Sequence, residues 1–395
     1  MENNKKVRVE IRKILSESFL TEGEIRLKFD IPLPKDIYKI KDVIKNAGYK
    51  LYVVGGAVRD ALLGKTPKDF DLATDALPDT IQNLLKPFYK TLETGKSFGV
   101  INVITPSGEY EIATFRKDIG KGRRPDAVEF TTIDQDVLRR DLTINALFYD
   151  IDTSEVVDLV GGIEDLKNGV VRTVGSPEER FDEDRLRILR AIRFAARFGS
   201  DLDAATDAAL KKDSNLNGVS PERIRDEFLK GIKSAKSVVH FLNMLQRYNL
   251  FHWIFGKLII KEQGMQSIAT IEEHDPAVLM AYLLSDNDIN TIKRELNELK
   301  YTVDEISQIS FLLAFRNLDL ENVYKLKKMQ ANSKLSDEQI RKYAQWMKMD
   351  MNLVNAFLDF KLTVTGQELM DAGFKGVELG KEMERREKEN FAKYL

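Results

Sequence analysis

The stretch from Gly55 to Asp75, GGAVRDALLGKTPKDFDLATD, begins with a glycine pair and ends with two closely spaced aspartates. The pair Gly55-Gly56 follows the apolar run LYVV and precedes a segment typical of a short helix, AVRDALLG. Backbone N–H groups at a helix start are free to bind phosphate, and glycine lets such a ligand approach closely. Arg59, in the first turn, adds positive charge. A glycine pair alone is more often only a turn, but with this arginine it predicts a phosphate-binding site.

Asp71 lies in FDLAT (70–74), which we expect to form a strand, and Asp69 comes directly before it. Residues i and i+2 of a strand share a face, so both carboxylates should point the same way and Phe70 into the core. Such a pair repels unless a cation lies between its members, and oxygen ligands of this kind suit Mg²⁺. Two such ions can activate an attacking hydroxyl group and stabilise a leaving pyrophosphate. Glu111, in the expected strand EYEIATF, is the candidate third carboxylate; an isolated Asp-x-Asp would more often be a surface accident.

A second cluster of charges lies in EDRLRILRAIRFAARFG at 183–199, which has strong helical periodicity. Asp184 and Arg187 are three residues apart, so we expect them to be neighbours on one helix face. The acceptors of the aspartate and the fixed donors of the arginine match the hydrogen-bonding edge of a nucleobase. Arg190 and Arg193 continue on nearly the same face and are placed to bind triphosphate oxygens. A salt-bridged surface helix is the alternative for this segment taken alone.

The elements around these residues divide the chain into two parts. Up to about residue 160, a helix at 36–48 and a short helix after the glycine pair alternate with runs typical of strands: LYVV, FDLAT, VINVI, EYEIATF and VEFTT. LRRDLTINALFYD reads as a helix that runs into a strand. After residue 160 glycine and proline are sparse and the pattern is helical. We therefore expect an α/β head with a mixed sheet, followed by an elongated all-α part.

Composition limits the class of protein. The chain has 395 residues, of which 43% are hydrophobic and 31% charged, as in globular proteins of several domains. The absence of cysteine excludes disulfides and thiolate metal sites, and three histidines argue against a multi-histidine site. Without a membrane span or a signal-peptide pattern, we expect a cytoplasmic protein. The net charge is −2, but residues 323–348 are rich in lysine and arginine. Such a run is most often a solvated helix face, and the alternative is a face that binds phosphate groups.

These motifs resemble those of a known family. GGAVRDALLGKTPKDFDLATD resembles the head signature of the nucleotidyltransferase superfamily, in the branch of class II tRNA CCA-adding enzymes and bacterial poly(A) polymerases. Further down the chain, RRDLTINAL (139–147) resembles the ribose-contacting motif, and DLVGGIEDL (158–166) the hinge between head and neck. EDRLRILRAIRF (183–194) resembles the base-selecting helix, and SPERIRDEF (220–228) the closing neck motif. TVTGQELMDAGFKGVELGKEM (363–383) resembles the tail element that grips tRNA.

The resemblance implies an architecture and a set of roles. It implies a polymerase-beta-like head at 36–160, a neck at 161–235, a body at 236–350 and a tRNA-binding tail at 351–395, after an N-terminal extension at 1–35. Asp69 and Asp71 would hold the metal, and Glu111 would assist the attacking hydroxyl group. Asp141 and Asn145 would hold the sugar. The full set of expected nucleotide-binding residues is Gly55, Gly56, Arg59, Arg140, Asp141, Asn145, Asp184, Arg187, Arg190 and Arg193.

The segment RKDIGKGRRPDAVEF (116–130) bears on the choice of nucleotide. It contains D-x-x-x-G-R as Asp118, Gly122 and Arg123. In the family, a flexible loop with this motif is associated with switching from CTP to ATP, so its presence favours ATP use. Bacterial poly(A) polymerases of the family tend to have a more basic stretch after the paired aspartates. Here ETGKSFGVINVI (93–104) is only mildly basic, which favours an enzyme that acts on tRNA over a poly(A) polymerase. We therefore expect a monomeric, Mg²⁺-dependent enzyme that adds CCA to the 3′ end of tRNA from CTP and ATP; A-only addition, a poly(A) polymerase and an inactive RNA-binding module are the alternatives.

Overall fold

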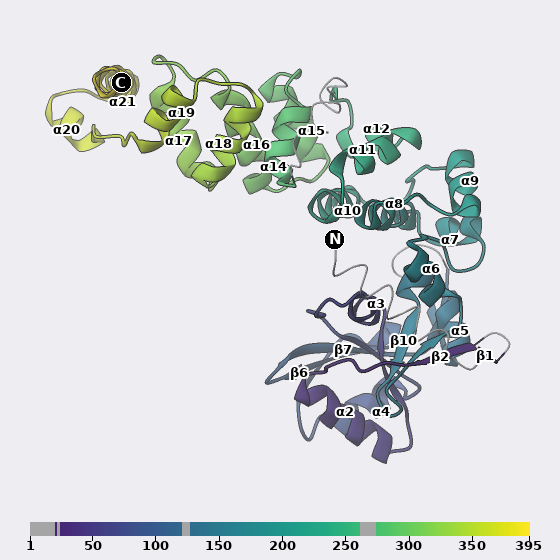
Figure 1. Ribbon diagram of the computed structural model, residues 1–395. Coiled ribbons are helices and arrows are strands. Elements are labelled where there is room, and N and C mark those ends of the chain that lie inside the picture. Colours follow the sequence, from purple (N-terminus) through teal and green to yellow (C-terminus); the bar gives the residue numbers. More distant parts are fainter. Residues whose placement is uncertain (1–19, 22–23, 121–126, 261–273) are drawn as a thin grey trace. The chain divides into compact units, whose positions relative to one another are not determined.

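The computed structural model describes residues 20–21, 24–120, 127–260 and 274–395 (Figure 1). The chain divides into two compact units, Met1–Val219 and Ser220–Leu395. All strands of the described residues lie in the first unit, and the described part of the second is helical. The expected neck, 161–235, is thus shared between the two units, because the second begins at Ser220.

The first unit is built on a nine-stranded mixed sheet, as expected. Its strand order is β1-β2-β11-β10-β3-β4-β7-β6-β5, in which β4 and β7 are parallel and all other neighbours antiparallel. The bounds are β1 Leu20–Thr21, β2 Glu24–Lys28, β3 Leu51–Val54, β4 Asp71–Thr74, β5 Lys90–Gly95, β6 Val100–Thr105, β7 Gly108–Thr114, β10 Leu147–Asp150 and β11 Glu155–Asp158. A separate hairpin consists of β8 Arg116–Ile119 and β9 Ala127–Phe130.

Strand β2 corrects one expectation. We expected residues 1–35 to form an extension outside the head, but β2 pairs with β11 from Ile25 to Lys28, with Leu27 opposite Val156. Leu27 is 2% exposed. The alternation in EIRLK is that of a strand with one buried face, although its charged residues conceal the pattern. The head sheet therefore begins before residue 36.

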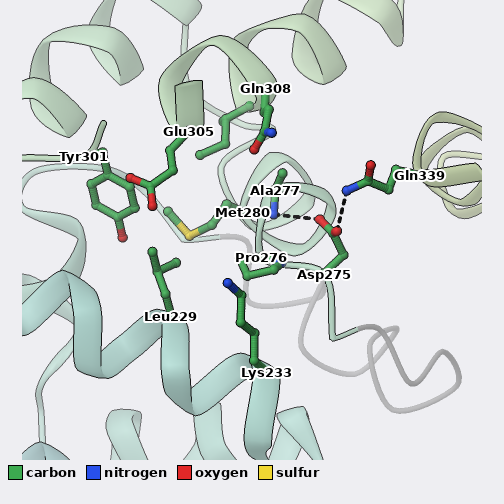
Figure 2. A pocket seen from close by; sticks show the side chains of 11 residues that line it. Leu229, Lys233, Asp275, Pro276, Ala277, Met280, Tyr301, Glu305, Gln308 and Gln339 are labelled. Carbon is green, nitrogen blue, oxygen red and sulfur yellow. Dashed lines mark hydrogen bonds between the residues drawn. The ribbon is translucent and has the colours of Figure 1, made fainter. Parts of the chain in front are cut away.

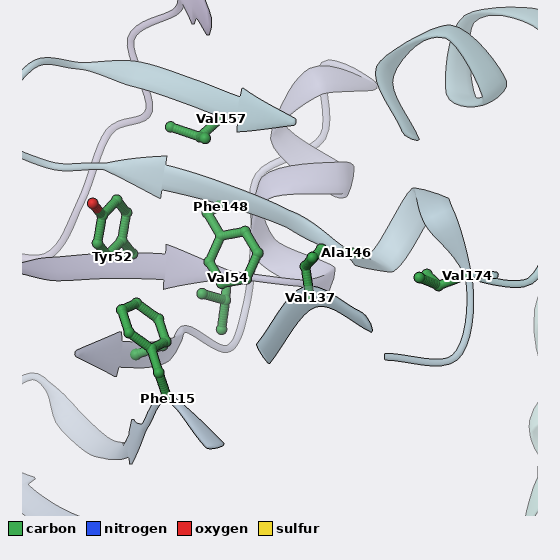
Figure 3. Packing of buried hydrophobic residues seen from close by; sticks show 9 residues of the cluster. Tyr52, Val54, Phe115, Val137, Ala146, Phe148, Val157 and Val174 are labelled. Carbon is green, nitrogen blue, oxygen red and sulfur yellow. The ribbon is translucent and has the colours of Figure 1, made fainter. Parts of the chain in front are cut away.

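The two faces of the sheet are covered differently. Helices α2 (Lys35–Asn46) and α4 (Pro78–Leu85) lie against one face, and α2 buries Ile37, Ile40 and Ile44 there. The other face carries a hydrophobic cluster, in which the ring of Phe148 lies 6.2 Å from that of Tyr52 (Figure 3). The cluster consists of Tyr52, Val54, Ala73, Phe115, Val137, Ala146, Phe148, Val157 and Val174. This apolar layer fixes the register of the strands that carry the site.

Short helices complete the first unit, and a series of helices forms the second. The first unit has α3 Gly56–Leu62, η1 Lys96–Phe98, α5 Ile133–Leu138, η2 Thr143–Asn145, α6 Gly162–Asn168, α7 Pro177–Glu183, α8 Leu186–Phe198 and α9 Ala204–Lys212. The second has α10 Pro221–Ser234, α11 Val238–Arg247, α12 Phe251–Phe255, α14 Pro276–Leu283, α15 Ile289–Glu298, α16 Val303–Phe315, α17 Val323–Ser333, α18 Asp337–Trp346, α19 Met351–Asp359, α20 Gly366–Asp371 and α21 Gly376–Tyr394. In the described parts of the chain, every helix is too short or too polar to span a bilayer.

Gly162 allows α6 to pack directly on η2, the turn that contains Asn145. A Cβ atom at Gly162 would lie 2.2 Å from the carbonyl oxygen of Thr143, which is backbone and moves only with the whole turn. The buried Asp158 carboxylate accepts hydrogen bonds from the N–H groups of Gly162 and Ile163, at 3.0 and 2.8 Å, and so fixes the start of α6. The close approach of α6 therefore holds η2 in place.

We expect Gly162→Ala to lower the free energy of unfolding by about 1–3 kcal/mol, because the added methyl group overpacks this contact. Gly380→Ala is the matched control, since a Cβ at this position in α21 would meet nothing within 4 Å. Alanine is favoured over glycine in a helix by about 1 kcal/mol, so the control should be neutral or stabilised. Urea unfolding followed by circular dichroism measures both. Equal stability of the two variants would contradict the close packing.

Candidate active site

Asp71 and Glu111 lie side by side on neighbouring strands. In the parallel pair β4–β7, Leu72 lies opposite Ile112, so the residues just before them, Asp71 and Glu111, occupy matching positions. Leu72 and Ile112 are buried, whereas both carboxylates reach solvent on the other face. The structure therefore brings together two of the three carboxylates that we predicted, on the face that also carries the hydrophobic cluster.

The charges of these groups act on one another. Burial raises the pKa of Asp71, and the negative charge of Asp69 raises it further, while Arg140 opposes the shift. Burial also raises the pKa of Glu111, to which the charge of Asp71 adds. A divalent cation would relieve this repulsion, and carboxylate oxygens are suitable donors for one. Within the described residues, no group of three or more histidine and carboxylate side chains is arranged to hold a metal ion by itself.

Asp69 is placed differently from our expectation. Strand β4 begins at Asp71, so Asp69 and Phe70 precede it, and strand alternation does not set their directions. Phe70 is only half-buried, where we predicted a core position. The reason is the register with β3: Asp71 pairs with Val54, the last residue of that strand, and the ladder has no partner beyond it. Asp69 stays within electrostatic range of Asp71.

The glycine pair forms a sharp turn from β3 into α3. Gly55 has φ of 70° and ψ of −122°, a conformation that strongly favours glycine. Its N–H group donates to the carbonyl oxygen of Leu147 at 3.0 Å, so this group is already used by the protein. A Cβ atom at Gly55 would lie 3.8 Å from Nη1 of Arg140. Because Gly55 has no side chain, the space beside the guanidinium of Arg140 stays open to a ligand at the start of α3.

Arg59 is buried, with 5% of its surface exposed. Its guanidinium donates to Oδ1 of Asn145 and, at 2.9 Å, to Oδ1 of Asp60. It also lies over the ring of Phe194, 4.8 Å from the centroid. Burial lowers the pKa of Arg59, although Asp60 opposes this effect. Because a Cβ at Gly56 would lie 3.5 Å from Nη2 of Arg59, the structure brings Gly56, Arg59 and Asn145 together.

Asp141 links the RRDLTINAL segment to helix α8. Its Oδ2 accepts a hydrogen bond from Nε of Arg190 at 2.6 Å, and its Oδ1 accepts from the N–H group of Leu142 and from Asn145. Burial opposes the charged form, but Arg190 and these hydrogen bonds hold the pKa of Asp141 below its ordinary value. Arg193, also on α8, lies over the ring of Phe194 at 4.3 Å. The predicted sugar and phosphate residues of the two segments are therefore neighbours.

Asp184 and Arg187 do not share a helix face, so this expectation was wrong. Helix α7 ends at Glu183 and α8 begins at Leu186, and between them the backbone of Asp184 is extended, with φ of −151° and ψ of 105°. Oδ1 of Asp184 accepts a hydrogen bond from the N–H group of Leu186 at 3.1 Å. Aspartate competes for free N–H groups at the start of a helix, which interrupts the helical segment that periodicity predicts.

Arg187 instead faces a cavity of about 250 Å³ in the first unit. Its guanidinium donates to Oε2 of Glu183 at 2.5 Å and to the carbonyl oxygen of Arg139 at 2.8 Å. Asp118 of the D-x-x-x-G-R motif lines the same cavity, whereas Gly122 and Arg123 lie outside the described residues. The full lining is Lys117, Asp118, Gly120, Gln135, Leu138, Arg139, Arg180, Glu183 and Arg187.

Asp136, which is 1% exposed, belongs to the site although none of the sequence motifs pointed to it. Its carboxylate accepts hydrogen bonds from Arg139 at 2.9 Å, from Arg140 at 3.0 Å and from the N–H group of Arg116 at 3.1 Å. The signal was present in the sequence, because residues at i, i+3 and i+4 are neighbours on a helix. A buried carboxylate between two arginines thus lies beside the predicted nucleotide-binding residues.

A second cavity, of about 240 Å³, lies among α10, α14, α16 and α18 of the second unit (Figure 2). Lys233 and Glu305 line it beside apolar residues such as Leu229 and Met280. Tyr301 also belongs to the lining, and its buried hydroxyl group has no hydrogen-bond partner among the described residues. None of the predicted site residues lines this cavity.

We expect Asp141→Asn to lower the free energy of unfolding at pH 7 by about 1–3 kcal/mol, because Arg190 loses its charged partner. The folded-state pKa of Asp141 is depressed, so its contribution is present above the unfolded pKa, about 3.9, and is lost as pH falls through the folded value. Urea unfolding of wild type and variant between pH 7 and pH 3 should therefore show a difference that shrinks with acidity. A difference independent of pH would contradict the ion pair.

Comparison with solved structures supports the fold. A CCA-adding enzyme of Bacillus stearothermophilus in complex with CTP superposes with a TM-score of 0.71, at 24% identity over 90% of this chain and 91% of that one. The Thermotoga maritima CCA-adding enzyme complexed with tRNA gives 0.66, at 21% identity over 96% and 94%. At these identities the likeness shows the fold alone, which confirms the expected α/β head followed by helices.

Sequence comparison identifies the family. The Poly A polymerase head domain matches residues 51–172, and the probable RNA and SrmB-binding site of polymerase A matches 201–260. The curated CCA-adding enzyme of Leuconostoc mesenteroides is 44% identical over 66% of this chain and 65% of its own length. That of Ligilactobacillus salivarius is 38% identical over 68% of this chain and 69% of its own length. On this similarity, the chain belongs to the family of CCA-adding enzymes within the tRNA nucleotidyltransferase and poly(A) polymerase group.

Proposed function

We propose that this protein adds CCA to the 3′ end of tRNA, without a template, from CTP and ATP. The observation that carries the proposal is the in-register pair Asp71 and Glu111, beside a glycine turn that leads to Arg140. Membership of the family indicates which substrates to expect, since its members are named CCA-adding enzymes. Solved structures with the same fold contain CTP, ATP or tRNA.

Asp69 and Asp71 would hold Mg²⁺, since they offer the oxygen donors that it prefers. Asp71 lies beside Glu111, whose pKa is raised by burial and by the charge of Asp71. When bound, Mg²⁺ ions supply activation of the attacking 3′-hydroxyl group and stabilisation of the leaving pyrophosphate. The raised pKa of Glu111 suits a group that accepts a proton from that hydroxyl.

The remaining residues would bind and orient the nucleotide. The turn at Gly55 and Gly56 allows the triphosphate to approach Arg59 and Arg140 closely. Asp141, Asn145, Arg190 and Arg193 would hold the ribose and further phosphate oxygens, because hydrogen bonds already fix Asp141 against Asn145 and Arg190. We place these roles on the residues by their arrangement and by family resemblance.

The base would be read beside the cavity that contains Arg187 and Asp118. Arg187 presents guanidinium donors there, whereas Oδ1 of Asp184 already accepts the hydrogen bond from the N–H group of Leu186. The helices of the body and tail, at 236–350 and 351–395, would hold the acceptor arm of tRNA by shape and phosphate contacts. Residues 323–348 of the body offer seven basic residues for this: Lys325, Lys327, Lys328, Lys334, Arg341, Lys342 and Lys348. We also propose that the enzyme acts as a monomer in the cytoplasm.

The test of the reaction uses three tRNA substrates, which end at the discriminator base, after C, and after CC. Each is incubated with Mg²⁺ and labelled CTP or ATP. We expect C to be added to the first two and A to the third. Failure to add C would refute full CCA addition in favour of A addition, and long A tails would indicate a poly(A) polymerase.

Asp71→Asn should reduce nucleotide incorporation by about 10²-fold or more, because the charge that binds the cation is lost. Binding of tRNA, measured by gel shift, should change little, which separates an enzyme from an inactive RNA-binding module. Asp75→Asn is the matched control in the same stretch. Asp75 accepts a hydrogen bond from the N–H group of Lys50 at 2.8 Å, and asparagine retains that acceptor. Undiminished incorporation by Asp71→Asn would refute the metal assignment.

A further inference from the structure

The carboxylate of Asp136 on α5 is fully occupied by cationic and backbone donors. Oδ1 accepts from Nε of Arg139 at 2.9 Å and from the N–H group of Arg116 at 3.1 Å. Oδ2 accepts from Nη2 and Nε of Arg140 at 3.0 and 3.3 Å. With 1% of its surface exposed, Asp136 has no access to a ligand. Its effect on any reaction must pass through the residues that it holds.

Arg140 connects Asp136 to the phosphate and metal end of the site. Its guanidinium lies over the ring of Phe148, 4.6 Å from the centroid, and next to the open side of Gly55. Its positive charge acts on Asp71, whose pKa it lowers against the effects of burial and Asp69. Burial disfavours the charged form of Arg140 itself, and Asp136 is the group that opposes this most.

Arg139 connects Asp136 to the base end of the site. Its Nε is shared between Asp136 and the carbonyl oxygen of Arg116 at 3.1 Å, and its Nη1 lies 3.8 Å from Oδ2 of Asp118. The backbone of Arg139 is equally committed, because its carbonyl oxygen accepts the hydrogen bond of Arg187 at 2.8 Å. Arg139 therefore contacts the start of the β8–β9 hairpin and, together with Glu183, holds the guanidinium of Arg187.

We propose that Asp136 is a positioning residue that couples the two ends of the nucleotide site. It holds Arg140 at the phosphate end and Arg139, with Asp118 and Arg187, at the base end. The proposal rests on the proposed function, since it assumes that this site binds a nucleotide. Without the charge of Asp136, two adjacent and partly buried arginines would be left uncompensated, and their repulsion would displace both. Phosphate binding and base selection should then fail together.

The test replaces Asp136 by asparagine, which has the same shape and no charge. We expect KM for both CTP and ATP to rise by about 10- to 100-fold, by analogy with the loss that follows removal of a hydrogen-bond partner that orients a metal ligand. Misincorporation of UTP and GTP should increase, with kcat affected less than KM. Asp134→Asn is the matched control, because Asp134 lies on the same helix, is exposed and makes no hydrogen bond among the described residues. It should match wild type in every measurement.

A purely structural role would lower stability and the amount of active enzyme without changing KM or base discrimination. Wild-type KM and discrimination in folded Asp136→Asn would therefore overturn the proposal. If that variant does not fold, Arg139→Lys provides the test, because lysine keeps the charge but cannot bridge Asp136 and the Arg116 carbonyl. Unchanged base discrimination in Arg139→Lys would again overturn the proposal.

Calorimetric titration of the same variants with CTP and ATP, without tRNA, keeps this test separate from the proposed function. If the wild-type protein binds nucleotides but fails to extend tRNA, that result refutes the proposed function and not the role of Asp136.

Discussion

The parallel pairing of β4 and β7 is the constraint on which the site depends. Because Leu72 lies opposite Ile112, the two carboxylates just before them are held at matching positions. Parallel strands need a long crossover, and here α4, β5 and β6 supply it. A shift of one residue in this register would turn one carboxylate toward the buried face, so the apolar layer that contains Ala73 and Phe115 also maintains the chemistry.

Charge compensation organises the rest of the site. Arginines of the site are paired with carboxylates: the buried Arg59 with Asp60, and the partly buried Arg140 and Arg190 with Asp136 and Asp141. Removing one member of such a pair is costly, because the other is left buried and uncompensated. The carboxylates at Asp71 and Glu111 differ, since burial and like charge raise their pKa values. The arginines of the site are thus neutralised by carboxylates of the protein itself, whereas Asp71 and Glu111 are left with a repulsion that a bound cation would relieve.

Patterns confined to a few neighbouring residues predicted the structure best. The glycine turn, the alternation that exposes Glu111 and the order of α/β head and helical part were predictable, because each depends on residues near in sequence. Strand β2 was missed because charged residues conceal its alternation. The shared helix face of Asp184 and Arg187 was wrongly predicted, because spacing assumes a continuous helix and the aspartate interrupts it. Asp136 was overlooked, although its spacing from two arginines was visible.

By itself, the sequence determined the types of group available: a glycine pair for close approach, paired acids for a cation, and arginines for phosphate and base. Those properties follow from side-chain chemistry and local backbone preferences, which act over a few residues. Only the tertiary structure decided that Asp71 meets Glu111, and that Asp136 accepts a hydrogen bond from the N–H group of Arg116 at the start of the β8–β9 hairpin. Such contacts join residues that are distant in the chain, and their geometry depends on strand register and burial, which no local pattern specifies.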